Sequence, residues 1–137
     1  MDKLDIKQRV LVTFYIEYQK DLPEMEKVNA TDLGISHDIF KMALLKLINE
    51  GLITGVEFTR GGQGNKILGA FTTNILMTSK GIDYVEQKLG ITPTLTAGEK
   101  VREVSKKVAE WGYNEIKDFT VKVAAEIAKS AMGLNGK

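Results

Sequence analysis

The sequence predicts an α+β, mainly helical fold: a winged helix-turn-helix with a two-stranded β-wing, followed by a long C-terminal helix. Three observations predict it. Residues 36–51 have the pattern of a capped amphipathic helix, two β-favouring segments joined by a glycine-rich turn follow directly, and residues 97–132 repeat apolar side chains without a proline. A helix that leads into a hairpin with a glycine tip is the second half of a winged helix-turn-helix.

The helix in residues 36–51 has clear signals at both ends. The Ser36 hydroxyl can accept from the unpaired N–H groups of the first turn, and Asp38 adds a favourable charge there. Gly51 stands where a left-handed residue would end the helix. Six apolar residues at helical spacing form the expected core face: Ile39, Phe40, Ala43, Leu44, Leu47 and Ile48.

Residues 4–20 form a helix that is apolar over most of its circumference. Because such a helix is covered on more than one side, we expect it to have a second partner besides its own domain. After Pro23, residues 28–34 read as a short helix that ends at glycine. These segments give the order helix, helix, turn, helix.

The expected wing consists of strands at 52–60 and 66–73, joined by the glycine-rich tip at 61–65. Residues 75–77 close the hairpin region, and Thr78 or Ser79 caps a further helix that Gly90 ends. We therefore divide the chain into a winged-helix domain, residues 1–92, and a linker with the long helix, residues 93–137.

The C-terminal helix starts with a capping box at residues 96–99 and continues to about Met132. Its apolar seam changes phase between Trp111 and Ile116, so the helix either continues with a local change of twist or breaks at Gly112. We favour an unbroken helix that packs on residues 4–20 across a homodimer. The candidate dimer contacts are Val104, Val108, Trp111 and Phe119.

Composition argues against several classes of function. The chain has no cysteine and one histidine, which leaves little for a thiol nucleophile or a zinc site, and no grouping of residues supports catalysis. Gly62 and Gly64 do not start a phosphate-binding loop, because they stand between strands. We expect no cofactor, no metal, no enzyme activity and no membrane span, and a charged N-terminus points to a cytoplasmic protein.

Residues 1–92 carry 11 Lys and Arg against 12 Asp and Glu, a net charge of −1, so net charge does not support DNA binding. Two interpretations of the wing and of residues 36–51 remain open on composition. In the first, basic and amide side chains contact DNA, mostly at its backbone: Lys41, Lys46, Asn49, Arg60, Asn65 and Lys66. In the second, Met42 and Leu45 pack against protein, either the long C-terminal helix or another subunit, since they suit a dry contact better than a groove.

Three runs resemble the YjcQ family of small bacterial and phage winged-helix proteins, over about residues 4–90. They are Gly34-Ile35-Ser36 leading to Phe40 and Leu47, the run Glu50-Gly51-Leu52-Ile53-Thr54-Gly55-Val56, and the run Met77-Thr78-Ser79-Lys80-Gly81-Ile82-Asp83-Tyr84-Val85. The resemblance implies the winged-helix fold, a bacterial or prophage source and a regulatory or DNA-associated role. The length of the C-terminal helix departs from the family.

The sequence thus predicts a small non-enzymatic regulator of phage or mobile-element origin that binds DNA as a dimer. The alternative is a protein-interaction module that uses the winged-helix surface without binding DNA. Exposed Met42 and Leu45 side chains would imply a partner surface, whereas coverage by the long helix would block the reading of a DNA groove by residues 36–51.

Overall fold

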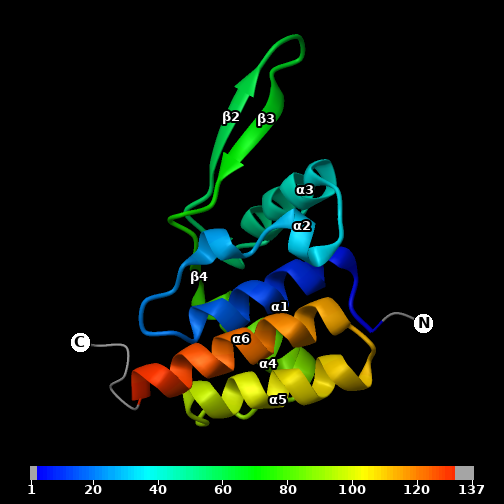
Figure 1. Ribbon diagram of the computed structural model, residues 1–137. Coiled ribbons are helices and arrows are strands. Elements are labelled where there is room, and N and C mark those ends of the chain that lie inside the picture. Colours follow the sequence, from blue (N-terminus) through cyan, green and yellow to red (C-terminus); the bar gives the residue numbers. More distant parts are fainter. Residues whose placement is uncertain (1–2, 132–137) are drawn as a thin grey trace.

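The computed structural model describes residues 3–131. It has an α+β, mainly helical fold with a winged-helix-like arrangement (Figure 1). The elements in chain order are α1 (Ile6–Tyr18), the 3-10 helix η1 (Met25–Lys27), α2 (Ala30–Leu33), α3 (His37–Asn49), β1 (Ile53–Thr54), β2 (Glu57–Gly61), β3 (Lys66–Phe71), β4 (Leu76–Met77), α4 (Ser79–Leu89), α5 (Ala97–Glu110) and α6 (Asn114–Ala131).

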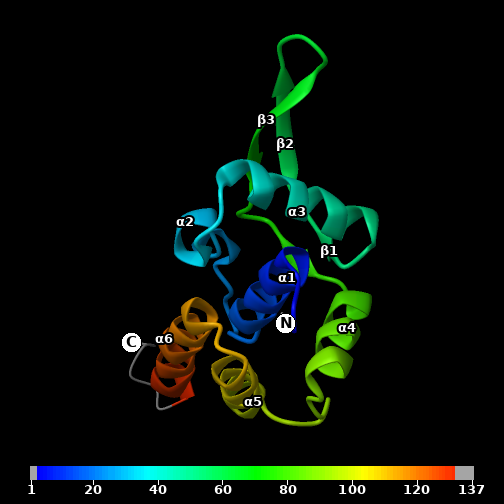
Figure 2. The ribbon, with the colours of Figure 1, turned by 90° about the vertical axis from the view of Figure 1, so that its right-hand side faces the viewer.

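Helix α1 is the central element of the fold. It begins in a capping box made by Asp5 and Gln8, and every residue from 10 to 17 is buried. Helices α3, α4 and α6 all pack against it, and the two ribbon views show it enclosed between them (Figures 1 and 2). The prediction that this helix packs against a second partner is confirmed, and that partner belongs to the same chain.

Helix α3 follows its sequence signals closely. Ser36 Oγ accepts from the Ile39 backbone N–H at 3.1 Å, and Gly51 adopts φ +74° just after the helix. Phe40, with Ala43, Leu44 and Leu47, forms the buried face. The assignment of Ile39 to that face is wrong, because its side chain is 44% exposed. It lies about 100° around the helix from Phe40, at the edge of the covered sector.

The β-strands form two separate antiparallel pairs, β1 with β4 and β2 with β3. The strand expected at 52–60 is divided at Gly55, which has φ +88°. A Cβ at Gly55 would lie 2.0 Å from the Asn74 carbonyl oxygen, so this crossing of the two chain segments needs glycine. Beyond the crossing, β2 and β3 project from the body as the wing (Figure 1).

The prediction of an unbroken C-terminal helix is wrong, because α5 and α6 are two helices that form a hairpin. Gly112 has φ +86°, its N–H donates to the Ala109 carbonyl oxygen, and the N–H of Tyr113 donates to that of Val108 at 2.8 Å. These two bonds are those of a Schellman motif, which ends α5. Trp111 is the C-cap residue. Met132, the expected end of the helix, lies outside the described residues.

The hairpin is joined to the rest of the fold by one continuous apolar core and by buried polar contacts. Glu86 of α4 accepts from the Tyr15 hydroxyl at 2.8 Å and from Lys100 Nζ of α5 at 2.7 Å. The Tyr113 hydroxyl donates to the Leu4 carbonyl oxygen and accepts from the Leu4 N–H. Residues 97–131 therefore share the core of the winged helix.

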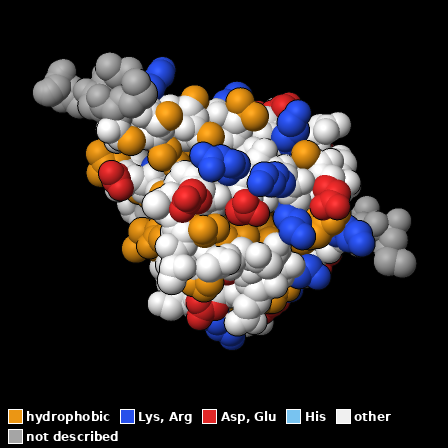
Figure 3. Space-filling view, turned by 90° about the horizontal axis from the view of Figure 1, so that it is seen from below, with side chains coloured by type: hydrophobic (Ala, Val, Ile, Leu, Met, Phe, Trp, Pro, Cys, Tyr) orange, Lys and Arg blue, Asp and Glu red, His pale blue; other side chains and the backbone are white. Residues whose placement is uncertain are grey.

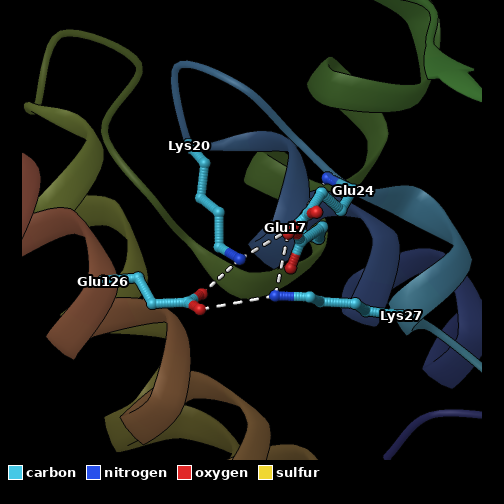
Figure 4. Close-up of polar contacts among 5 residues, drawn as sticks. All are labelled: Glu17, Lys20, Glu24, Lys27 and Glu126. Atoms are coloured by element: carbon cyan, nitrogen blue, oxygen red, sulfur yellow. Dashed lines mark hydrogen bonds and ion pairs between the residues drawn. The ribbon is translucent and has the colours of Figure 1, made fainter. Parts of the chain in front are cut away.

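A chain of ion pairs fixes α6 beside α1 and η1 (Figure 4). Lys20 lies between the buried carboxylate of Glu17, at 2.9 Å, and Glu126 of α6. Lys27 contacts Glu126 at 3.4 Å and Glu24 at 2.8 Å. The hydrogen bond from Lys20 is the main reason why the pKa of Glu126 lies below its ordinary value.

Candidate nucleic-acid interface

Helix α3 and the wing occupy one end of the molecule, and α5 lies at the other (Figures 1 and 2). Helix α6 packs on α5, α1 and α2. In the described part of the chain, the C-terminal hairpin therefore leaves the outer face of α3 uncovered. None of the helices in residues 3–131 combines the length and the apolar composition that crossing a bilayer would require.

The outer face of α3 is apolar at its centre. Met42 is 50% exposed, whereas Leu45 is half-buried on the flank. Lys46 and Asn49 are exposed in the C-terminal half of the helix. Lys41 is directed toward its own fold: its Nζ lies 3.3 Å from an Asp38 carboxylate oxygen and donates to the Leu68 carbonyl oxygen of the wing at 3.4 Å.

The wing brings Arg60, Asn65 and Lys66 together at its tip. Arg60 is paired with Ile67 and Gly61 with Lys66, and a bulge lies between Thr59 and Arg60. The Arg60 guanidinium donates to the Asn65 carbonyl oxygen at 3.4 Å. All three residues are exposed. Three of the six predicted DNA contacts are therefore neighbours at the tip, and the other three are spread along α3.

The wing is also the least acidic part of the chain. Residues 58–82 contain no Asp or Glu, whereas the whole chain has 18 of them. The ion pairs within residues 3–131 include neither Arg60 nor Lys66, so both charges are free for a ligand. The side opposite the wing is different, because Lys, Arg, Asp and Glu are mixed there with apolar side chains (Figure 3).

Most of the exposed large apolar side chains in the described chain belong to α3 and to two strands. Eight large apolar side chains are exposed within residues 3–131, and five of them belong to α3, β3 or β4: Ile39, Met42, Leu68, Phe71 and Leu76. Of these five, only Met42 was predicted. Phe71 is paired with the exposed Glu57 and shares its face, but alternation along β3 would have placed it with the half-buried Ile67 and Gly69.

The predicted dimer contacts lie elsewhere. Val104 and Val108 are fully buried, and Trp111 and Phe119 are half-buried against the same core. These four side chains are thus covered within the chain, which removes the exposed seam that motivated a homodimer. A dimer would need another surface.

A hollow of about 590 Å³ separates the segment after α1 from the end of α6. Lys20 and Glu126 line it and pair with each other, so neither offers an unpaired charge to a ligand. Among residues 3–131, no three His, Asp or Glu side chains are grouped closely enough to hold a metal ion.

The model of the YjcQ protein family matches residues 10–111. The chain belongs to this family. The YjcQ match includes α3 and the wing and extends past the expected residue 90 to the end of α5, which leaves α6 outside it. No match was found among curated proteins or among solved structures. Since YjcQ membership assigns no role to any residue, the function is argued from the surface of α3 and the wing.

Proposed function

We propose that this protein is a non-enzymatic winged-helix regulator that binds double-stranded DNA through α3 and the wing. One observation carries the proposal: the wing presents Arg60 and Lys66 without carboxylate partners, beside a helix α3 that the rest of the described chain leaves open. Neutralising phosphates with such cations supplies most of the affinity of nonspecific DNA binding. The regulatory role and a phage or mobile-element origin rest on the family resemblance.

Helix α3 offers few groups for reading bases. Asn49 can pair with adenine and Lys46 with guanine in a major groove. Asp38 would face phosphates at the leading end of the helix, where its charge opposes binding. The proposed contact is therefore mainly to the DNA backbone, which positions a protein but does not by itself select a sequence.

A protein-interaction module is the second candidate, because Met42 and Ile39 are exposed on α3. Together with the three apolar side chains of β3 and β4, they make up most of the exposed large apolar groups of the described chain. Large apolar side chains left exposed in this number are typical of contact surfaces between proteins. In this interpretation, the basic side chains would form the rim of a protein interface.

A homodimer remains a proposal for both candidates. Its interface would use exposed side chains at the α3 and wing end, because the seam of α5 is buried in its own chain. Light scattering on a sizing column, at tens of micromolar protein, measures the mass directly. A dimer whose mass falls to that of one chain in Met42→Ser would place the contact on α3.

Fluorescence anisotropy with a labelled mixed-sequence duplex tests DNA binding. We expect binding that weakens steeply with salt and is lost when the four cations of this end become glutamine: Lys41, Lys46, Arg60 and Lys66. The matched control neutralises four exposed lysines of other elements: Lys88, Lys106, Lys117 and Lys122. Equal loss in both variants would refute binding through α3 and the wing. No binding of the unaltered protein at low salt would refute DNA binding and favour the second candidate.

A further inference from the structure

The wing and α3 differ in how much of their charge is available to a ligand. The acid-free segment 58–82 begins just after Glu57, so both cations at the tip stand away from carboxylates along the chain. On α3, Asp38 lies 3.3 Å from Lys41. A phosphate near the tip would therefore meet Arg60 and Lys66, which have no carboxylate partner in the described chain. A phosphate near the start of α3 would meet Lys41, whose charge Asp38 partly neutralises.

The backbone of the tip is open to close approach. Gly62 and Gly64 have φ +70° and +78°, and a Cβ built on either would meet nothing within 4 Å. Asn65 also has a positive φ, and its N–H donates to the Gly62 carbonyl oxygen at 3.3 Å, which closes the turn. A tip with so little side-chain bulk can enter a groove and bring its backbone N–H groups to a phosphate.

The strands of the wing fix the positions of Arg60 and Lys66 at the tip. The register shifts at this point because Leu68 of β3 is an extra residue opposite the step from Thr59 to Arg60. The bond from the Arg60 guanidinium to the Asn65 carbonyl oxygen then fixes the arginine across the turn. Lys66 follows on the facing strand, so the two cations flank the glycines.

From these observations we infer that the wing is the primary DNA-binding element, and that it engages the backbone and a groove of duplex DNA with little sequence preference. Helix α3 lies beside the duplex and contributes less, because its centre is apolar and its first lysine is paired. This inference rests on the proposed function, since it assumes that the ligand is DNA.

Two double variants with equal charge change test the inference: Arg60→Gln with Lys66→Gln on the wing, and Lys41→Gln with Lys46→Gln on α3. Anisotropy with a labelled mixed-sequence duplex is measured over a range of salt concentrations. We expect the wing variant to bind about 10-fold more weakly at low salt and to lower the salt slope by about 2, one for each phosphate contact. For the α3 variant we expect a loss of less than about 3-fold.

A second pair of variants tests the same inference while keeping Arg60 and its bond across the turn. Gln63→Glu places a negative charge at the exposed tip, and Gln87→Glu makes the same change on the exposed surface of α4. We expect only Gln63→Glu to weaken binding, by a few-fold. Circular dichroism in urea confirms that each variant keeps the stability of the unaltered protein.

The possible outcomes separate the inference from the proposed function. An α3 variant that loses as much affinity as the wing variant, or more, overturns the inference and leaves DNA binding in place. A preference of more than about 100-fold among unrelated duplexes also overturns it, since contacts to backbone alone do not discriminate so strongly. If the unaltered protein binds no duplex at low salt, the proposed function itself fails.

Discussion

Two valines of α6, only two residues apart, give a direct test of whether this helix belongs to the cooperative fold. Val123 is 1% exposed in the core, whereas Val121 is 57% exposed on the same helix. Helix α6 lies outside the family match, and its docking depends on the break at Gly112. We therefore compare Val123→Ala with Val121→Ala.

The expected difference follows from the two methyl groups that each substitution removes. At Val123, losing them from the core costs about 1.6 kcal/mol in transfer free energy, and the cavity that remains raises the loss to about 2–3 kcal/mol. At Val121, the methyl groups already face water, and we expect a change within about 0.5 kcal/mol. Alanine favours the helix equally at both positions, so helix propensity cancels in the comparison.

Urea unfolding followed by circular dichroism and by the fluorescence of Trp111 measures both free energies. The midpoint of Val123→Ala should fall while its m-value stays that of the unaltered protein. Coincident transitions for the two probes would show that α6 unfolds with the rest. Equal midpoints for the two variants would refute the packing of α6 on the core.

Two further predictions concern glycine packing and pH. Gly81→Ala should destabilise the fold by at least about 2 kcal/mol, because its Cβ would lie 2.1 Å from the Leu52 carbonyl oxygen. Gly98→Ala has its nearest contact at 3.8 Å and should stabilise the fold by about 0.5 kcal/mol. Urea unfolding measures both changes. The lowered pKa of Glu126 stabilises the fold above the ordinary value of 4.5, and this contribution is lost as pH falls through the lowered pKa. Thermal unfolding should therefore show Glu126→Gln less stable by under about 1 kcal/mol at pH 7, with the difference vanishing in acid, because solvent screens this part-exposed pair.

Three helix ends were predictable from a glycine that is followed by an apolar residue. Gly34, Gly51 and Gly90 were read as helix ends, and each carries the two Schellman hydrogen bonds that also occur at Gly112. The glycine at 112 is followed by Tyr113, whose ring is buried as the motif requires. The pattern together with the phase slip of the apolar seam indicates the break at Gly112, whereas the pattern alone also occurs at Gly81 inside α4.

The candidate interface was only partly predictable, because some of its properties depend on long-range packing. Helical spacing placed Met42 on the outer face, and it is exposed. The pairing of Lys41 with Asp38 follows from their spacing on one helix, whereas its bond to the carbonyl oxygen of Leu68, 27 residues away, depends on the wing lying beside α3. No spacing within the sequence indicates that contact.

Net charge is a poor test of DNA binding for this chain, because it averages over charges that a ligand at the wing would not meet. The winged-helix segment has a net charge of −1, yet its acidic side chains are absent from residues 58–82. At physiological salt, charges more than about 8 Å apart through solvent are largely screened. A phosphate at the tip of a projecting wing therefore interacts with Arg60 and Lys66 and only weakly with the carboxylates of the body. The relevant quantity is the charge near the contact, and residues 58–82 carry Arg60, Lys66 and Lys80 without a carboxylate.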